Sequence, residues 1–180
     1  MNDYEEKMQK AIDSLTADFA TIRAGRANPH ILDKIKVDYY GTPTNLQSVA
    51  NVSVPEARTI MITPWEASMI KEIEKAIMIS DLGVNPNNDG KNVIVNFPEL
   101  TEERRKELAK DIKKKGEDAK VIVRNARRDA NEAAKKQNKA GELSDDEYAD
   151  AEDDIQKATD KFVKEIDKLV ESKTKEVLTV

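Results

Sequence analysis

Cysteine is absent from this sequence of 180 residues, and several other residue types are scarce. Without cysteine the chain forms no disulfide, no thiolate metal site and no cysteine nucleophile. Histidine occurs once, at His30, which excludes the usual kind of histidine metal cluster. Aromatic residues make up only 4% of the chain, too few for a platform that stacks single-stranded bases. We therefore predict no cofactor and no metal site.

Long apolar runs are also missing. None approaches the ~20 residues that a helix needs to span a bilayer. Residues 1–6 are acidic and lack the apolar centre of a signal peptide. We therefore expect a soluble, cytoplasmic monomer that does not contact a membrane.

Charge is abundant but unevenly distributed along the chain, whose formal net charge is −5. Residues 101–140 hold 14 basic and 8 acidic side chains, a net charge of +6. Residues 141–180 hold 6 basic and 13 acidic side chains, a net charge of −7. One basic block in an acidic protein favours an anionic partner that is met by one face only.

Three segments show the apolar period of a helix. The first is predicted over residues 2–26, and Pro29 disfavours helix beyond it. The second runs through residues 101–140 without proline. Its apolar face is marked by Leu108, Ile112, Ala119, Ile122, Ala126, Ala130 and Ala133. The third starts at a capping box formed by Ser144 and Glu147.

The segment between the first two helices has a different composition and a different apolar period. All six prolines lie between Pro29 and Pro98, and apolar residues alternate around positions 35–39, 52–54, 60–62 and 93–97. Alternation predicts short strands. One helix is expected among them, capped by Thr63, with Pro64 in its first position.

The predicted fold is α+β. A long three-helix bundle of residues 1–29 and 101–180 carries a small α/β domain, residues 30–100, inserted between helices 1 and 2. The two crossings, residues 27–30 and 97–100, are the predicted hinge. Its residues are Asn28, Pro29, His30, Phe97, Pro98 and Glu99.

The second helix carries a row of cations, which we call the basic stripe. On a helical wheel its members fall within about a third of the circle, on the side that we expect to face away from the core. They are Lys106, Lys110, Lys113, Lys120, Arg124, Arg127, Arg128 and Lys135. Arg23 and Arg26 join this surface if the bundle packs them beside it. The pattern suits phosphates of structured RNA or DNA, and an ordinary solvated face is the alternative.

Other chemistry finds little support in the sequence. Paired carboxylates such as Asp153 and Asp154 suit a solvated helix face better than general acid–base catalysis. There is no glycine-rich phosphate loop and no nucleophile with a base. We predict that the chain is not an enzyme. A helical adaptor that binds a protein through its acidic third helix is the rival interpretation.

Six sequence blocks together resemble the ribosome recycling factor family. They span nearly the whole chain in order: IRAGRANP at 22–29, YYGTPT at 39–44, EKAI at 74–77, SDLGVNP at 80–86, LTEERRK at 100–106 and VRNARRDAN at 123–131.

The resemblance implies an L-shaped molecule whose bundle lies on the large ribosomal subunit, on 23S-type rRNA. It implies that elongation factor G with GTP then acts on the smaller domain, so that the subunits separate and release mRNA and tRNA. It gives Arg127 a role in ribosome binding, which we extend to Arg26, Arg124 and Arg128. We expect the rRNA-binding residues to be Arg23, Arg26, Lys113, Lys120, Arg124, Arg127 and Arg128.

Overall fold

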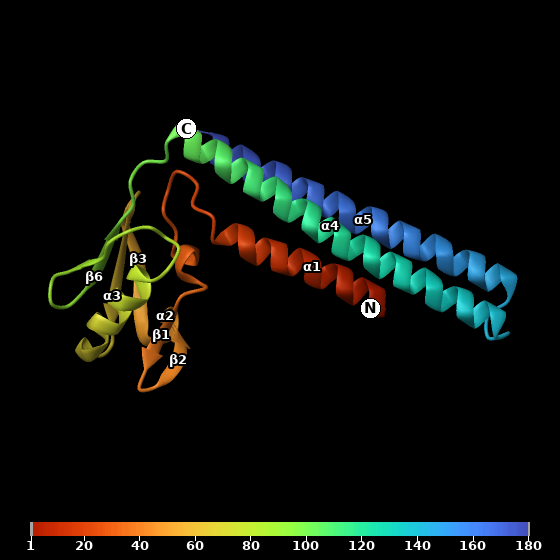
Figure 1. The fold of residues 1–180 in the computed structure, drawn as a ribbon, viewed down its shortest axis with the longest axis horizontal. Helices are drawn as coiled ribbons and strands as arrows, with labels where there is room; N and C mark the ends of the chain where they lie inside the picture. The colour runs from red at the N-terminus through yellow and green to blue at the C-terminus, as the bar shows by residue number, and fades with distance from the viewer. Residues whose placement is uncertain (1, 180) are drawn as a thin grey trace. The chain divides into compact units, whose positions relative to one another are not determined.

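The computed structural model describes residues 2–179, which form two compact units (Figure 1). The helical unit consists of the chain up to Phe19 and of Lys106–Leu178. The mixed unit consists of Ala20–Arg105 and Thr179. The α+β class and the insertion of the mixed unit between the first and second long helices agree with the sequence prediction.

Three helices make up the helical unit: α1 (Asp3–Ala20), α4 (Glu102–Lys139) and α5 (Asp145–Leu178). Each buries one apolar face, as its helical period predicts. The buried apolar residues of α1 are Met8, Ala11, Ile12, Leu15 and Phe19, and those of α5 include Ile155, Phe162, Ile166 and Val177.

A tight turn joins α4 to α5 and confirms the predicted capping box. The backbone N–H of Glu147 donates to Ser144 Oγ at 3.1 Å, and the backbone N–H of Ser144 donates to Glu147 Oε1 at 3.3 Å. Gly141 ends α4 with φ of 80°, a left-handed conformation that glycine adopts without strain. The side chain of Asn138 donates to Leu143 O, which ties the turn to the end of α4.

The helix α1 is shorter than predicted. It ends at Ala20, whereas the sequence suggested helix to residue 26. Residues 21–27 instead pack within the mixed unit, where Ile22, Ala24 and Ala27 are buried. The N–H of Ala27 donates to Ala57 O at 2.7 Å, a tertiary bond that replaces a helical one.

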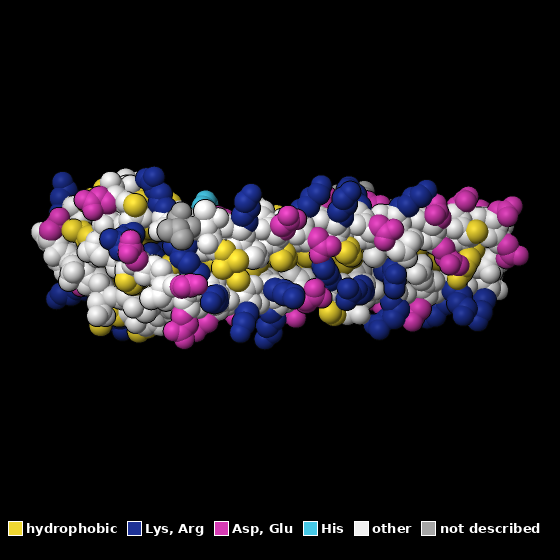
Figure 2. Space-filling model, turned by 90° about the horizontal axis from the view of Figure 1, so that it is seen from above, with side chains coloured by type: hydrophobic (Ala, Val, Ile, Leu, Met, Phe, Trp, Pro, Cys, Tyr) yellow, Lys and Arg dark blue, Asp and Glu magenta, His cyan; other side chains and the backbone are white. Residues whose placement is uncertain are grey.

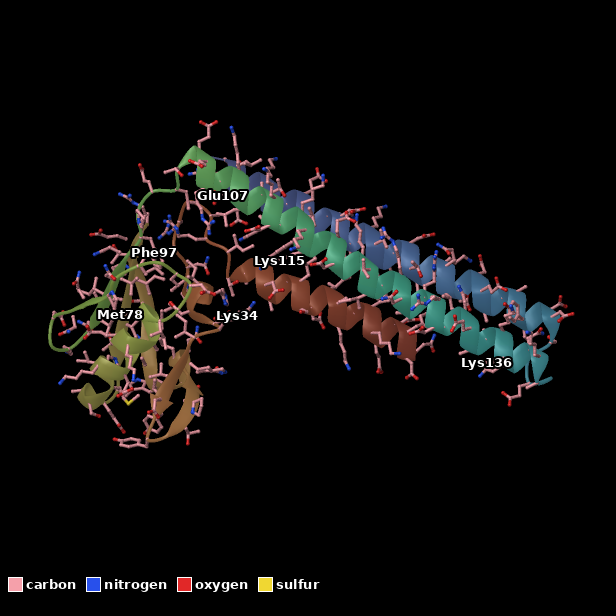
Figure 3. The ribbon with its side chains drawn as sticks, in the orientation of Figure 1. Lys34, Met78, Phe97, Glu107, Lys115 and Lys136 are labelled. Carbon is pink, nitrogen blue, oxygen red and sulfur yellow. The ribbon has the colours of Figure 1, made fainter. Side chains whose placement is uncertain are left out.

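The hairpin of α4 and α5 runs on past α1 (Figure 1). Figure 3 shows Lys136 near its closed end, well beyond the start of α1. Ala126 and Ala134 are the buried residues of α4 toward this end. Their small side chains suit two helices that pack closely on each other.

The mixed unit contains two antiparallel sheets and short helices. A two-stranded sheet pairs β1 with β2, and a four-stranded sheet has the order β3-β4-β6-β5. The strands are β1 (Lys36–Tyr39), β2 (Thr42–Asn45), β3 (Ala50–Glu56), β4 (Thr59–Pro64), β5 (Asn87–Asn88) and β6 (Val93–Asn96). The helical elements are η1 (Pro29–Leu32), α2 (Leu46–Val49), η2 (Ala67–Met69) and α3 (Ile70–Met78).

Alternation along the strands builds the core of the mixed unit. Ile60 and Ile62 of β4 and Val93 and Val95 of β6 are fully buried, as their period of two predicts. α3 buries Ile70, Ile73 and Ile77 against the same core, which confirms the predicted apolar face.

The predicted start of this helix was wrong. Thr63 and Pro64 belong to β4, where Pro64 pairs with Ala50 at the strand end. Thr63 Oγ1 donates to Asn92 Oδ1 at 2.6 Å and caps no helix. Proline is tolerated at a strand end because few ladder bonds are lost there. The sequence pattern of cap and proline was thus overridden by strand pairing.

Gly116 brings α4 and α5 close together. A Cβ added at this position would overlap a methyl group of Val170 on α5 and approach Ile166. Glycine weakens a helix by ~1 kcal/mol relative to alanine, so the sequence alone gives it a purely negative role. The structure shows instead that the absence of a side chain at Gly116 allows α4 and α5 to pack closely together.

Replacing Gly116 by Ala should therefore destabilise the protein despite the better helix propensity of alanine. Overpacking costs about 1–3 kcal/mol, against a propensity gain of ~1 kcal/mol. We expect a net loss of about 1 kcal/mol and a thermal midpoint about 2–4 °C lower, measured by circular dichroism. Gly25→Ala is the matched control, because nothing lies within 4 Å of the added Cβ. A higher midpoint for Gly116→Ala would contradict the close approach.

Candidate nucleic-acid interface

The basic stripe lies along α4, as predicted. Most of its side chains are exposed, namely Lys106, Lys110, Lys113, Arg124, Arg128 and Lys135, whereas Lys120 and Arg127 are partly buried. Figure 2 shows basic side chains along both long edges of the helical unit, with acidic ones among them. The stripe is therefore a surface that a polyanion can reach.

The stripe does not lie opposite the core, as the sequence analysis expected. The buried face includes Val123 and Ala134, whereas Ile122 is 50% exposed and Ala133 is exposed. At ~100° per residue, the centre of the stripe is then about 120° from the centre of the buried face. One border of the stripe consequently meets α5, and the residues at this border are Lys120 and Arg127.

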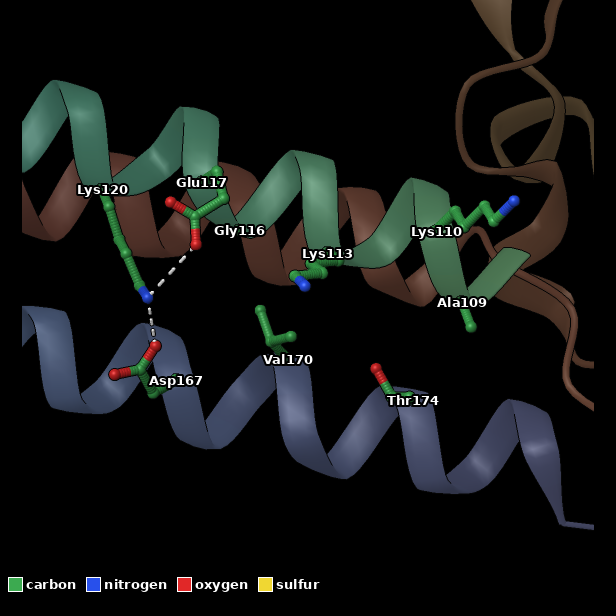
Figure 4. Close-up of a pocket in the computed structure, with 9 residues that line it drawn as sticks. All are labelled: Ala109, Lys110, Lys113, Gly116, Glu117, Lys120, Asp167, Val170 and Thr174. Carbon is green, nitrogen blue, oxygen red and sulfur yellow. Dashed lines mark hydrogen bonds and ion pairs between the residues drawn. The ribbon is translucent and has the colours of Figure 1, made fainter. Parts of the chain in front are cut away.

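Lys120 is held at this border by carboxylates. Its Nζ forms an ion pair with Asp167 on α5 and lies 3.5 Å from Glu117 Oε1 (Figure 4). Only 16% of the Lys120 side chain is exposed. The hydrogen bond that Lys120 donates to Asp167 raises the pKa of Lys120 above its usual value, outweighing the opposite effect of desolvation. The charge of Lys120 is thus already compensated within the protein.

A groove of about 420 Å³ runs beside this ion pair between α4 and α5. Gly116 of α4 and Val170 of α5 are among the residues that line it (Figure 4). Lys110 and Lys113 line the groove too, and Figure 4 draws neither with a partner among the residues shown. Within residues 2–179, neither of these two lysines nor Arg124 forms a salt bridge. These cations remain available to an anionic ligand.

Arg127 contacts α5 through a neutral group. Its Nη1 donates to Gln156 Oε1 at 3.2 Å. Nothing in the sequence pattern suggested this partner, which lies 29 positions away. The neighbouring Arg128 is exposed and only loosely paired, with Nε 3.9 Å from Asp129 Oδ1. The arginine-rich end of the stripe therefore keeps its positive charge.

Arg23 and Arg26 are not on a helix and belong to the mixed unit. The Arg23 guanidinium lies 5.4 Å from the centre of the Phe97 ring, and its Nη2 donates to Pro98 O. Burial lowers the pKa of Arg23, and the charges of Arg58 and Arg105 lower it further. Arg26 is exposed. The helical stripe thus gains neither arginine by extension of α1.

The predicted hinge residues also lie inside the mixed unit. Asn28 caps η1, and its Oδ1 accepts from the N–H of His30 at 2.9 Å. The His30 ring lies 3.0 Å from Asp33. Phe97 is buried, and its N–H donates to Arg58 O at 2.7 Å. Arg23, which precedes the first crossing, donates a hydrogen bond to Pro98 O in the second crossing.

Metal sites and membrane-spanning helices were two further possibilities for residues 2–179. No group of three or more histidine, aspartate or glutamate side chains is placed to hold a metal ion. Among the same residues, every helix is too short or too polar to cross a membrane.

The ion pair of Lys120 generates a test of the border between α4 and α5. Lys120→Met should lower the free energy of unfolding by about 1 kcal/mol, measured by urea denaturation. Because the folded-state pKa is raised, this contribution is complete below pH ~10.5 and is lost as the pH rises through the folded pKa. Lys157→Met is the control, since its 2.7 Å pair with Asp153 is exposed and confined to α5. Equal effects of the two substitutions would contradict a special role for Lys120.

Comparison with known proteins is consistent with this architecture. The family model described as "Ribosome recycling factor" matches residues 15–178. The ribosome-recycling factor of Lachnoclostridium phytofermentans is 66% identical over 177 residues, 98% of this chain and 96% of that protein. The corresponding factor of Agathobacter rectalis is 64% identical over 180 residues, 100% of this chain and 98% of that protein.

Solved structures agree. A solution structure of the ribosome recycling factor matches with a TM-score of 0.80 and 39% identity, covering 98% of this chain and 94% of that one. A second match has a TM-score of 0.66 and 43% identity, and covers 98% of this chain and 96% of the other. It belongs to models for the T. thermophilus ribosome recycling factor and the E. coli elongation factor G bound to the E. coli post-termination complex. By sequence and by fold, this chain belongs to the ribosome recycling factor family.

Proposed function

We propose that this protein recycles ribosomes after termination. It binds the post-termination ribosome in the cytoplasm as a monomer. With elongation factor G and GTP it promotes separation of the subunits and release of mRNA and tRNA. Membership of the family supports this function, and so does the similar factor that is placed with elongation factor G on a post-termination complex.

The exposed basic stripe on α4 is the structural feature that best supports this function. Lys113, Arg124 and Arg128 point charge into solvent along a rigid helix, and arginine suits bidentate contact with phosphate. A rigid row of cations grips a folded polyanion through its backbone and releases counterions. We assign this surface to 23S-type rRNA of the large subunit.

The protein itself needs no catalytic group for this task. Chemical energy enters through GTP bound to elongation factor G, and this chain supplies a rigid binding element and a second unit on which the factor acts. Lys120 plays a smaller part in RNA binding than the sequence suggested, because Asp167 and Glu117 already compensate its charge.

The rival function, a protein adaptor that uses the acidic face of α5, is less well supported. Several of its acidic side chains have partners within the unit. Asp167 pairs with Lys120, for example, and Asp160 accepts from Gln156 at 2.9 Å. Part of the negative charge of α5 therefore serves to hold side chains in place.

We also propose that the two units pivot during recycling. Arg23, Ala27 and Phe97 are bonded within the mixed unit, to Pro98, Ala57 and Arg58 respectively. These bonds hold both crossings against the mixed unit. Bending is then expected closer to the helical unit, around residues 20–22 and 99–105, than at the hinge that the sequence suggested.

Arg127→Ala tests the stripe. Loss of a charge-assisted bond to phosphate should weaken binding to purified large subunits by about 1.5–3 kcal/mol. The slope of log affinity against log salt should become shallower by about one unit. Because Arg127 bonds to Gln156, a loss of stability of up to about 1 kcal/mol is expected as well.

The matched control is Lys164→Ala, an exposed cation on α5 outside the stripe, which should leave affinity and salt dependence unchanged. A folded Arg127→Ala protein that binds as tightly as wild type would reduce the stripe to a solvated face.

Replacing residues 20–105 by a Gly/Ser linker tests whether the helical unit alone binds large subunits and whether splitting requires the mixed unit. The helical unit has its own core, so we expect it to stay helical and to bind large subunits. In a splitting assay with post-termination ribosomes, elongation factor G and GTP, wild type should separate the subunits and the variant should not. Splitting by the variant would show that the mixed unit is dispensable, and splitting by neither protein would overturn the proposed function.

A further inference from the structure

Three side chains, joined by two hydrogen bonds, connect α4 to α5 at the arginine-rich end of the stripe. Arg127 Nη1 donates to Gln156 Oε1 at 3.2 Å, and Gln156 Nε2 donates to Asp160 Oδ1 at 2.9 Å. Gln156 and Asp160 are four positions apart, so they lie on the same face of α5. These hydrogen bonds connect Arg127, a predicted RNA contact, to Gln156 and Asp160, which have no other assigned role.

The chemistry of the three groups fixes the direction of both bonds. A guanidinium only donates, an ionised carboxylate only accepts, and a carboxamide does one at each end. Gln156 therefore satisfies both neighbours in one orientation of its amide and in neither when flipped. Asp160 holds the amide so that its oxygen faces Arg127.

This arrangement restrains Arg127 without neutralising it. Lys120, at the same border of the stripe, is paired with carboxylates, whereas the immediate partner of Arg127 is a neutral amide. A guanidinium has five N–H donors, and this bond occupies one of them. The other donors stay available to phosphate oxygens.

We infer that Gln156, oriented by Asp160, is a positioning residue that presents the Arg127 guanidinium to an rRNA phosphate. The inference rests on the proposed function of the stripe. Holding the Arg127 side chain in place preorganises it for binding. Immobilising a long side chain on binding costs about 0.5–1.5 kcal/mol, and much of this ordering is already present in the free protein.

The test is a double-mutant cycle of Gln156→Ala and Arg127→Ala in the full-length protein, with affinity for purified large subunits as the readout. The preorganisation cost above corresponds to a weakening of about two- to twelvefold for Gln156→Ala alone. In the Arg127→Ala background, Gln156→Ala should change the affinity less than twofold. Thermal unfolding of each variant checks that the exposed substitution leaves the helices folded.

Two further variants sharpen the cycle. Asp160→Ala should reproduce part of the loss, because the amide of Gln156 is then free to flip. Gln9→Ala is the matched control, since Gln9 forms an equivalent pair with Asp13 on α1, also at 2.9 Å, and should not affect binding.

Each outcome decides the inference. Coupling between Gln156 and Arg127 supports it. An equal loss in both backgrounds overturns it, because Gln156 would then act independently of Arg127, and so does no loss at all. If Arg127→Ala alone leaves binding unchanged, the stripe assignment itself fails, which is distinct from a failure of the positioning role.

Discussion

The close approach of α4 and α5 at Gly116 is the constraint on which the rest of the helical unit depends. Val170 occupies the space that a side chain at position 116 would fill. This contact fixes how α4 is rotated about its axis, and so which residues are buried and which border α5. Because of that rotation, Lys120 and Arg127 reach α5, while Arg124 and Arg128 face solvent. A helix rotated by one residue would present a different set of cations.

The cations at the border of the stripe differ in the kind of partner that they contact on α5. Carboxylates contact Lys120 at the packing of α4 on α5, whereas Arg127 donates to the neutral amide of Gln156. The acidic excess of α5 is therefore partly structural. A basic face on a protein of net charge −5 confines polyanion binding to one side and disfavours unspecific contact elsewhere.

Periodicity in the sequence predicted most elements, but not the tertiary contacts that set their ends and rotation. The strands β1, β3, β4 and β6 and the capping box at Ser144 follow from local patterns, whereas β2 and β5 lie where those patterns indicated turns. The end of α1 was missed because Ala27 bonds to Ala57, a residue remote in sequence. The rotation of α4 was misjudged because alanine marks a buried face poorly, so Ala133 was chosen where Ala134 is buried. The stripe was found from spacing, whereas Gln156 was invisible to any local pattern.

We propose that the stripe on α4, and not the acidic face of α5, binds the large subunit. Amine labelling of the full-length protein, free and bound to large subunits, followed by mass spectrometry, tests this residue by residue. We expect binding to protect Lys110, Lys113 and Lys135. Lys120 should react slowly even in the free protein. The lysines of α5 that should stay reactive are Lys161, Lys164 and Lys168. Protection of the α5 lysines with an unprotected stripe would contradict it.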